Sequence, residues 1–312
     1  MSTREFATRD DPSPIAGEVA APAAGGGVAQ ELTSGRPQGR IWVRLRTHPS
    51  ALVGIAILAV YVLASLFGPL IFRYDPIHQN LSDAFLPSSL AHPLGTDDLG
   101  RDELVRLLFG ARYTLALGFA AVAIGVGIGL PLGAISGYFG GWIDLSSQRV
   151  TDILLAFPNI LLALALVATL GVGLQNVILA VGITSIPIFV RLVRASSLSV
   201  RELPYVEAGR ALGVPSVVVL FRHVVPNSLA PVIVQASLQL GAAILIAAGL
   251  GFLGLGVQAP TPEWGTMLGL SRNYIFSNPN LATFPGLAIF GAVLAFNLLG
   301  DGLRDALDPR LK

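Results

Sequence analysis

The chain of 312 residues contains no cysteine, and its only lysine is the last residue, Lys312. Without cysteine, neither a disulfide nor a thiolate metal site can form. The phosphate-binding loop of ATPases requires a lysine that directly follows its second glycine and reaches the terminal phosphates. Because no internal lysine exists, this chain cannot carry that loop. If ATP drives its function, another subunit hydrolyses the ATP.

Charge is also scarce. Only 12% of the residues are charged, 53% are hydrophobic, and the mean hydropathy is +0.69. This composition lies outside the usual range of soluble domains, and the net charge of +1 gives no reason to expect a nucleic-acid partner. Residues 1–39 are rich in Ala, Pro and Gly and predict a disordered tail. No apolar core of the signal-peptide type follows Met1, so we expect no cleavage.

The sequence contains several long apolar segments. A membrane-spanning helix needs about 20 apolar residues, and the sequence predicts six spans, at about 51–72, 113–137, 153–173, 175–193, 229–256 and 284–300. We therefore expect an all-α integral membrane protein. Its predicted parts are a tail (1–39), a first span with an outer loop and an interfacial helix (40–112), a five-helix core (113–300) and a second tail (301–312).

The predicted spans contain no ionisable residue except Arg191, near the end of the fourth. Ion-coupled transporters commonly place such a residue at membrane depth, so its absence weakens the alternative of a secondary transporter or channel without excluding it. It equally weakens an intramembrane protease. We find no catalytic set and no compact set of metal ligands.

The basic residues predict the orientation. If the N-terminus is cytoplasmic, the external segments hold only Arg73, Arg101, Arg106, Arg112 and Arg272, and all other basic residues face the cytoplasm. The cytoplasmic side then includes a loop predicted over 138–152. Positive residues are enriched on the cytoplasmic side of membrane proteins. We therefore expect both termini inside.

The longest polar stretch, residues 191–228, contains a predicted cytoplasmic loop over 194–228. Pro204 can open a helix that ends near Gly213, and Pro215 can open a second helix that runs to about Val225 and stops before Pro226. Two short helices joined in this way predict a bent projection. A polar loop of this length suggests a docking element, although a solvated loop with prolines and glycine in its turns is the alternative.

The order Glu207-Ala208-Gly209, then Gly213, then Val225-Pro226 resembles the coupling loop of ATP-binding cassette importer permeases. Its spacing matches the family signature, but Gly209, His223 and Val225 differ from the usual letters. The resemblance implies that the loop docks in a groove of an ATPase subunit. The residues expected to make this contact are Tyr205, Glu207, Ala208, Gly209, Arg210, Leu212, Gly213 and Pro226.

Two predicted external segments indicate a subfamily within this permease family. Residues 94–102, LGTDDLGRD, and 260–265, PTPEWG, are similar to the C-type subunit of the dipeptide, oligopeptide and nickel permease group. Residues 94–112 have an apolar stripe and predict an interfacial helix before the second span. Trp264 suits the membrane interface. Glu263 would either contact a delivering binding protein or be a solvated loop carboxylate.

Uncharged polar residues within the spans are candidates for the translocation path. Each could instead hydrogen-bond between helices. The candidates are Asn159, Thr184, Ser185, Gln235, Gln239 and Asn297, together with Gln175, Asn176 and Ser237.

The resemblance implies a type I importer permease fold of six transmembrane helices with cytoplasmic coupling helices. It also implies alternating access driven by two separate ATPase subunits, which carry ATP and Mg²⁺, while this chain binds no cofactor and catalyses no reaction. The other expected partners are a homologous second permease, an extracytoplasmic substrate-binding protein and the lipid bilayer. The implied cargo is peptides or nickel.

Overall fold

The computed structural model describes residues 48–71 and 75–307. The tail predicted over 1–39 and the end of the second tail, 308–312, lie outside the described residues. Within the described ranges the chain is helical, and the only β pairing is an isolated bridge between Thr96 and Asp102. The prediction of an all-α protein is confirmed.

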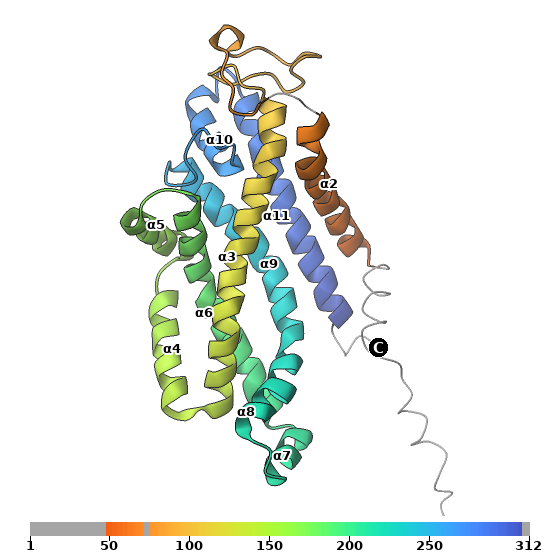
Figure 1. Ribbon diagram of the computed structural model, residues 1–312, viewed down its shortest axis with the longest axis vertical. Helices are drawn as coiled ribbons and strands as arrows, with labels where there is room; N and C mark the ends of the chain where they lie inside the picture. The colour runs from red at the N-terminus through yellow and green to blue at the C-terminus, as the bar shows by residue number, and fades with distance from the viewer. Residues whose placement is uncertain (1–47, 72–74, 308–312) are drawn as a thin grey trace, which may run out of the picture. The chain divides into compact units, whose positions relative to one another are not determined.

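Figure 1 shows long helices packed side by side, with shorter ones toward the two ends and along one side of the bundle. The helices are α2 (Pro49–Ile71), α3 (Glu103–Phe139), α4 (Gly141–Leu155), α5 (Asn159–Leu170), α6 (Leu174–Arg201), α7 (Pro204–Ala211), α8 (Ser216–Val219), α9 (Val225–Phe252), α10 (Trp264–Ser271) and α11 (Asn280–Leu307).

In the part of the chain that the structure describes, these helices provide five membrane spans, and six if the bent pair of α4 and α5 counts as one span. The five are each long and apolar enough to cross a membrane, and the pair is bent by 90°. The third predicted span, 153–173, therefore corresponds to the end of α4, a break at 156–158, and α5. Residues 141–152, expected in a cytoplasmic loop, are helical instead. Hydropathy alone did not predict this helix because α4 carries charged residues. Two of these residues form ion pairs with arginines of α6.

The spans run up and down, so two sets of segments gather at opposite ends of the bundle. In Figure 1 the turn between α3 and α4 and helices α7 and α8 lie at one end, whereas the loop 75–102 and α10 lie toward the other. Helix α2 begins and α11 ends partway along the bundle, each at its end that points toward α7 and α8. His48 Nε2 lies 2.7 Å from Asp305 Oδ2, which joins the start of α2 to the last turns of α11.

The most extensive contact in the bundle is between α3 and α6. Gly125, Gly129, Gly133 and Gly137 recur every fourth residue and line the face of α3 that meets α6. A Cβ atom built at Gly133 would lie 2.6 Å from the carbonyl oxygen of Val190. The stripe thus lets the two backbones approach closely, as small residues do between helices in membranes.

Of the segment predicted as a separate interfacial helix, 94–112, residues 103–112 belong to α3 and residues 94–102 to the outer loop. Asp102 caps this helix by accepting a hydrogen bond from the Val105 N–H at 2.8 Å, and the helix continues without a break to Phe139. Its first turn is buried on one side, at Glu103, Val105 and Arg106. The prediction was wrong because the outer loop covers this turn, which an amphipathic pattern alone does not reveal.

Candidate functional site

A bent projection leaves the bundle between α6 and α9, where the sequence predicts a docking element. Pro204 is the first residue of α7, and the helix ends before Gly213, whose φ is +76°. Gly213 N–H donates to the Arg210 carbonyl at 3.0 Å, and Val214 N–H to the Gly209 carbonyl at 3.1 Å. A left-handed residue followed by such bonds is a common helix ending that favours glycine. Pro215 then precedes α8.

The second helix of the projection does not stop before Pro226, so that prediction was wrong. After α8 the backbone forms a π-helical turn, Leu220–Val224, and runs directly into α9. Proline has no N–H to offer to a helix, and a π-turn is one way to accommodate such an interruption without ending the helix. The projection is therefore anchored rigidly to α9 on one side and joined by a short turn to α6 on the other.

The predicted contact residues are spread over the outside of this projection. The exposed fraction is 44% for Tyr205 and 84% for Leu212. Gly209 is half-buried, and the remaining candidates are exposed, namely Glu207, Ala208, Arg210, Gly213 and Pro226. The structure thus presents this set to a partner.

Sequence reasoning missed the buried side of the projection and part of its apolar tip. Val206, Val219 and Val224 are fully buried and hold the projection against the bundle. Val217 and Phe221 are exposed and line a shallow pocket with Val218 and Arg222. Three consecutive valines after a helix-opening proline were the available signal. Together with Leu212, the exposed apolar residues form a surface at the tip, which suits a protein groove rather than water.

Two arginines hold the end of α3, one from the projection and one that is the last residue of α6. Arg210 Nε donates to the Tyr138 hydroxyl at 3.3 Å, and its guanidinium carbon lies 4.7 Å from the centre of the same ring. Arg201 Nη1 donates to the carbonyl of Gly137 at 3.2 Å. Both contacts end on the last residues of α3, so α3 is held by the projection as well as by α6.

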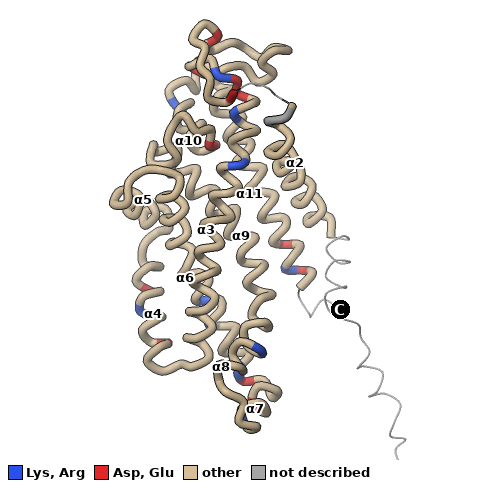
Figure 2. The backbone as a smooth tube through the Cα atoms, in the orientation of Figure 1, with Lys and Arg blue, Asp and Glu red and all other residues tan. Residues whose placement is uncertain are grey.

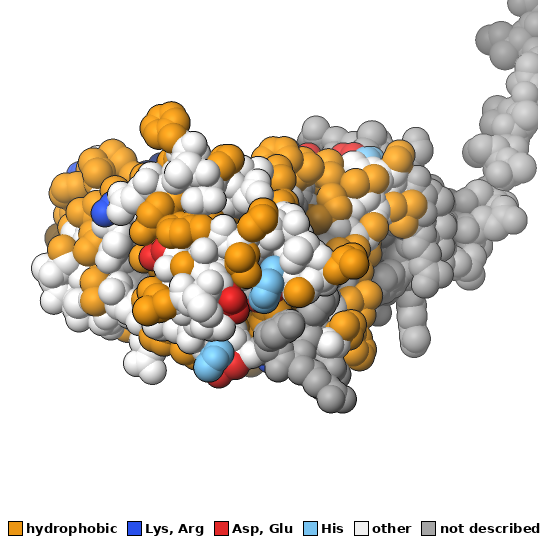
Figure 3. Space-filling view, turned by 90° about the horizontal axis from the view of Figure 1, so that it is seen from above, with side chains coloured by type: hydrophobic (Ala, Val, Ile, Leu, Met, Phe, Trp, Pro, Cys, Tyr) orange, Lys and Arg blue, Asp and Glu red, His pale blue; other side chains and the backbone are white. Residues whose placement is uncertain are grey.

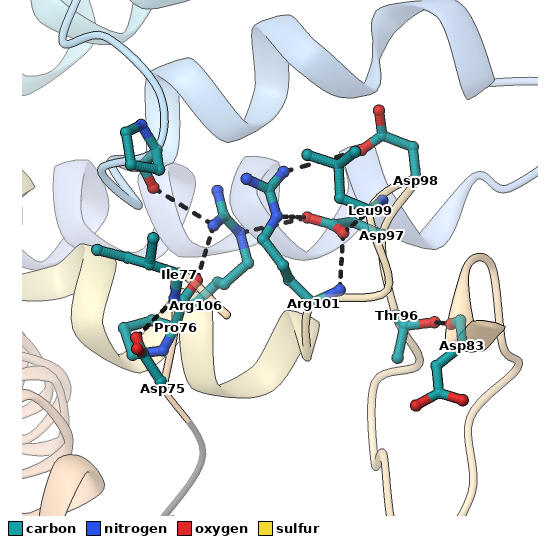
Figure 4. Close-up of polar contacts among 11 residues, drawn as sticks. Asp75, Pro76, Ile77, Asp83, Thr96, Asp97, Asp98, Leu99, Arg101 and Arg106 are labelled. Atoms are coloured by element: carbon teal, nitrogen blue, oxygen red, sulfur yellow. Dashed lines mark hydrogen bonds and ion pairs between the residues drawn. The ribbon is translucent and has the colours of Figure 1, made fainter. Parts of the chain in front are cut away.

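The opposite end of α3 is held by a second set of polar contacts, around the buried Arg106. Figure 4 shows its guanidinium between Pro76 and Asp97. Nη1 donates to the Pro76 carbonyl at 2.9 Å and to the Pro260 carbonyl at 3.5 Å, and Nε lies 3.5 Å from Asp97 Oδ2. One arginine of α3 therefore joins the outer loop to the connection between α9 and α10.

Glu263 and Trp264, expected in an exposed loop, are both almost fully buried. Glu263 caps α10 by accepting from the N–H groups of Gly265 and Thr266 at 3.0 and 2.9 Å, and it also accepts from Thr114 Oγ1 at 3.1 Å. Trp264 Nε1 donates to the Leu107 carbonyl at 2.9 Å. Neither side chain is available to an external partner, because both fasten α10 to α3.

The face at this end of the bundle carries scattered apolar side chains among polar ones (Figure 3). Leu90 and Phe276 are fully exposed. Among residues 48–71 and 75–307, no group of three or more His, Cys, Asp or Glu side chains is arranged to hold a metal ion.

Comparison with known proteins identifies the bundle. Residues 129–312 match the family model described as the binding-protein-dependent transport system inner membrane component, and residues 37–91 match that of the N-terminal transmembrane domain of oligopeptide transport permease C. The chain belongs to this permease family. The C-type permease assignment made from the sequence is thereby confirmed.

Relatives of the permease cover nearly its whole length. It is 48% identical over 282 residues to the dipeptide transport system permease protein DppC of Alkalihalophilus pseudofirmus, covering 90% of this chain and 93% of that protein. It is 46% identical over 284 residues to the glutathione transport system permease protein GsiD of Pectobacterium atrosepticum, covering 88% and 92% of the two chains. The GsiD protein of Escherichia coli (strain UTI89) is 45% identical, with coverage of 88% and 91%.

Among solved structures, the permease resembles a chain of the MetNI methionine ABC transporter in an inward-facing conformation. The TM-score is 0.53 at 23% identity, over 65% of this chain and 96% of that one. A likeness at this identity shows the fold, which is that of a type I importer permease, as expected.

The path candidates divide into two groups in the permease. Ser185 and Gln239 are buried, and Gln239 Nε2 donates to Ser185 Oγ at 3.0 Å between α9 and α6. Thr184 is buried and donates to its own helix, at the Val181 carbonyl. The second group has exposed surface: Asn297 is exposed on α11, whereas Asn159 and Gln235 are half-buried. Of these six candidates, the second group could meet a substrate in the present conformation.

Proposed function

We propose that this chain is the C-type transmembrane subunit of a bacterial ATP-driven importer that moves peptides inward across the cytoplasmic membrane. The observation that carries the proposal is the exposed projection, built from α7 and α8 and fastened to α3 at Tyr138 through Arg210. The absence of any internal lysine supports the same conclusion, because the ATPase must be a separate subunit. Relatives named for dipeptide and glutathione transport favour a peptide over nickel as cargo.

The proposed partners follow from the same family. They are a homologous second permease, two ATPase subunits that bind ATP and Mg²⁺, and an extracytoplasmic substrate-binding protein. This chain binds no cofactor and performs no chemical step in the proposal. The start of α2 and the end of α11 are the ends of these helices that point toward the projection (Figure 1), which supports an arrangement with both termini in the cytoplasm.

The mechanism that we propose is alternating access. When ATP closes the ATPase pair, the groove that holds α7 and α8 carries the projection with it. Because Arg210 and Arg201 hold the end of α3, this motion reaches a helix that extends to the outer loop and α10. The spans then open outward to receive substrate, and hydrolysis returns them to the inward-facing state. Such coupling requires that the inward-facing and outward-facing states differ in their contacts at both ends of the permease.

The proposal is tested by changing the projection without touching the spans. Glu207→Ala and Gly213→Asp are each expected to abolish peptide uptake and substrate-stimulated ATP hydrolysis in the complete transporter, while the amount of protein in the membrane stays normal. Glu207 is exposed, and Gly213 has open space around it, so neither change disturbs the bundle. Undiminished uptake by both variants would contradict the proposal.

A further inference from the structure

Helix α4 is paired with α6 by two ion pairs. Asp144, Gln148 and Asp152 recur every fourth residue and therefore share one face of α4. Asp144 Oδ2 accepts from Arg194 Nη2 at 2.6 Å, and Asp152 Oδ1 accepts from Arg191 Nη2 at 2.8 Å. In Figure 2, charged positions appear along α4 as well as at the two ends of the bundle.

The second of these pairs lies within the membrane-spanning part of the bundle. Arg191 follows Val190, whose backbone packs against Gly129 and Gly133 of α3, inside the predicted span 113–137. On the other helix, Asp152 lies eleven residues beyond the start of α4, which corresponds to about 16 Å along a helix axis at about 1.5 Å per residue. The pair is thus well removed from the turn that joins α3 to α4.

The side chains of the Arg191–Asp152 pair are partly exposed. The side chains of Arg191 and Asp152 are 57% and 52% exposed, whereas those of Arg194 and Asp144 are 30% and 19% exposed. Exposed charges at membrane depth are costly in lipid, and they are found facing water-filled cavities or other protein. The opposite face of α4 differs, because its exposed residues Ile143 and Val150 are apolar and suit lipid.

We propose that Asp152 and Arg191 line a water-filled stretch of the translocation path and contact the charged ends of a passing peptide. This proposal rests on the function proposed above. A zwitterionic peptide presents an ammonium group, which pairs with the Asp152 carboxylate, and a carboxylate, which pairs with the Arg191 guanidinium through charge-assisted hydrogen bonds. The mutual ion pair satisfies both side chains when no peptide is present.

The break between α4 and α5 supports this position for the path. It begins one turn after Asp152, at residues 156–158, and the helices on its two sides differ in direction by 90°. Non-helical backbone at membrane depth is tolerated where it is buried in protein or lines a water-filled cavity. Asn159, a path candidate from the sequence, is the first residue of α5 and follows this break directly.

The chain contains no cysteine, so single cysteines can report on water access without a prior change of background. We would introduce Asp152→Cys and Arg191→Cys one at a time, together with the controls Val150→Cys and Ile143→Cys. The controls have similar exposure but lie on the opposite face of α4. Each variant would be assembled with the complete transporter in lipid and treated with a charged, membrane-impermeant methanethiosulfonate reagent.

Thiolate is the reacting form, and desolvation of a thiol raises its pKa and removes the thiolate. We therefore expect the Asp152→Cys and Arg191→Cys variants to react more than about tenfold faster than the two controls, since each pKa unit changes the thiolate fraction by about tenfold. We also expect a saturating dipeptide to slow the reaction of both path variants. Equal rates on the two faces, or no reaction of either path variant, would overturn the proposal.

This experiment distinguishes an error in the proposed translocation path from an error in the proposed cargo. If the unmodified transporter does not take up peptides but the two faces differ in reactivity, the water-filled path stands and the cargo is wrong. If uptake is normal and the faces do not differ, or if dipeptide fails to slow the reaction, the role of Asp152 and Arg191 is wrong and the permease function stands.

Discussion

Arg210 of α7 lies against Tyr138 at the end of α3, with its guanidinium carbon 4.7 Å from the ring centre and its Nε 3.3 Å from the hydroxyl oxygen. A guanidinium over an aromatic face is attracted by the ring quadrupole in addition to the hydrogen bond. Because α3 runs from this contact to Arg106 and the outer loop, the pair joins the projection to both ends of the permease.

Removal of this pair is predicted to uncouple the transporter. In Arg210→Gln and Tyr138→Leu, the projection still docks but no longer moves α3 with it, so uptake should fall on the order of tenfold, within the range of a coupling energy of about 1–3 kcal/mol. ATP hydrolysis without substrate should persist. The measurement is uptake per ATP hydrolysed in proteoliposomes. Tyr138→Phe keeps the ring and should retain most of the activity.

Arg304→Gln serves as the matched control for this prediction, because Arg304 is also exposed and lies in the last turn of α11, at the end that points toward α7 and α8. It should behave as the unmodified protein. If Arg210→Gln and Arg304→Gln show the same uptake per ATP hydrolysed, the contact between Arg210 and Tyr138 has no role in coupling.

The two glycines of the projection are predicted to respond differently to alanine. Gly213 has φ of +76°, where alanine is strained by about 1 kcal/mol or more, so Gly213→Ala should distort the turn between α7 and α8 and lower uptake. Gly209 lies inside α7 with nothing within 4 Å of an added Cβ atom. Gly209→Ala should therefore assemble and transport normally. Equal loss in both variants would show that the surface near Gly209, rather than the turn, decides docking.

Glu263→Ala is predicted to destabilise the outer end of the permease. The change removes the acceptor for two N–H groups of α10 and for Thr114. Loss of a helix cap costs about 1 kcal/mol, and leaving buried donors unpaired adds about 1–3 kcal/mol. The apparent melting temperature of the detergent-solubilised complex should fall. Asn273→Ala, at an exposed position just beyond α10, should leave it unchanged; a similar melting temperature for both variants would contradict the assigned role.

Arg106→Ala should have a larger effect of the same kind. It leaves Asp97 with a single buried arginine, Arg101, and frees the carbonyls of Pro76 and Pro260. Breaking a buried ion pair from one side costs on the order of 3 kcal/mol or more. We expect rapid proteolysis within the loop 75–102 of the folded complex, whereas the exposed Arg272→Ala should resist. Protease resistance in both would mean that Arg106 does not hold the loop.

The coupling projection could be predicted from the sequence because its signals are local. Proline opens α7, Gly213 ends it, and both act within a few residues. The family likeness rests on the same short segment. The tip formed by Val217, Val218 and Phe221 was overlooked, since a short apolar run does not distinguish an exposed contact surface from a buried helix.

Features that depend on distant segments could not be predicted. Asp144 and Asp152 made α4 look like a cytoplasmic loop until their partners on α6 were known. Glu263 looked solvated because its acceptor role depends on Thr114, 149 residues away in sequence. Ser185 and Gln239 looked equally suited to the path and to contacts between helices, and only the packing of α6 against α9 shows that they hydrogen-bond to each other here.

The central claim is that this permease moves peptide only when separate ATPase subunits drive it through the projection. The most direct test is uptake of radiolabelled dipeptide into proteoliposomes that contain the two permeases, with the binding protein and peptide outside. We predict uptake when the ATPase subunits and ATP are present inside, and none when the ATPases are left out. Uptake of the same size without the ATPases would contradict the account and favour a secondary transporter or channel.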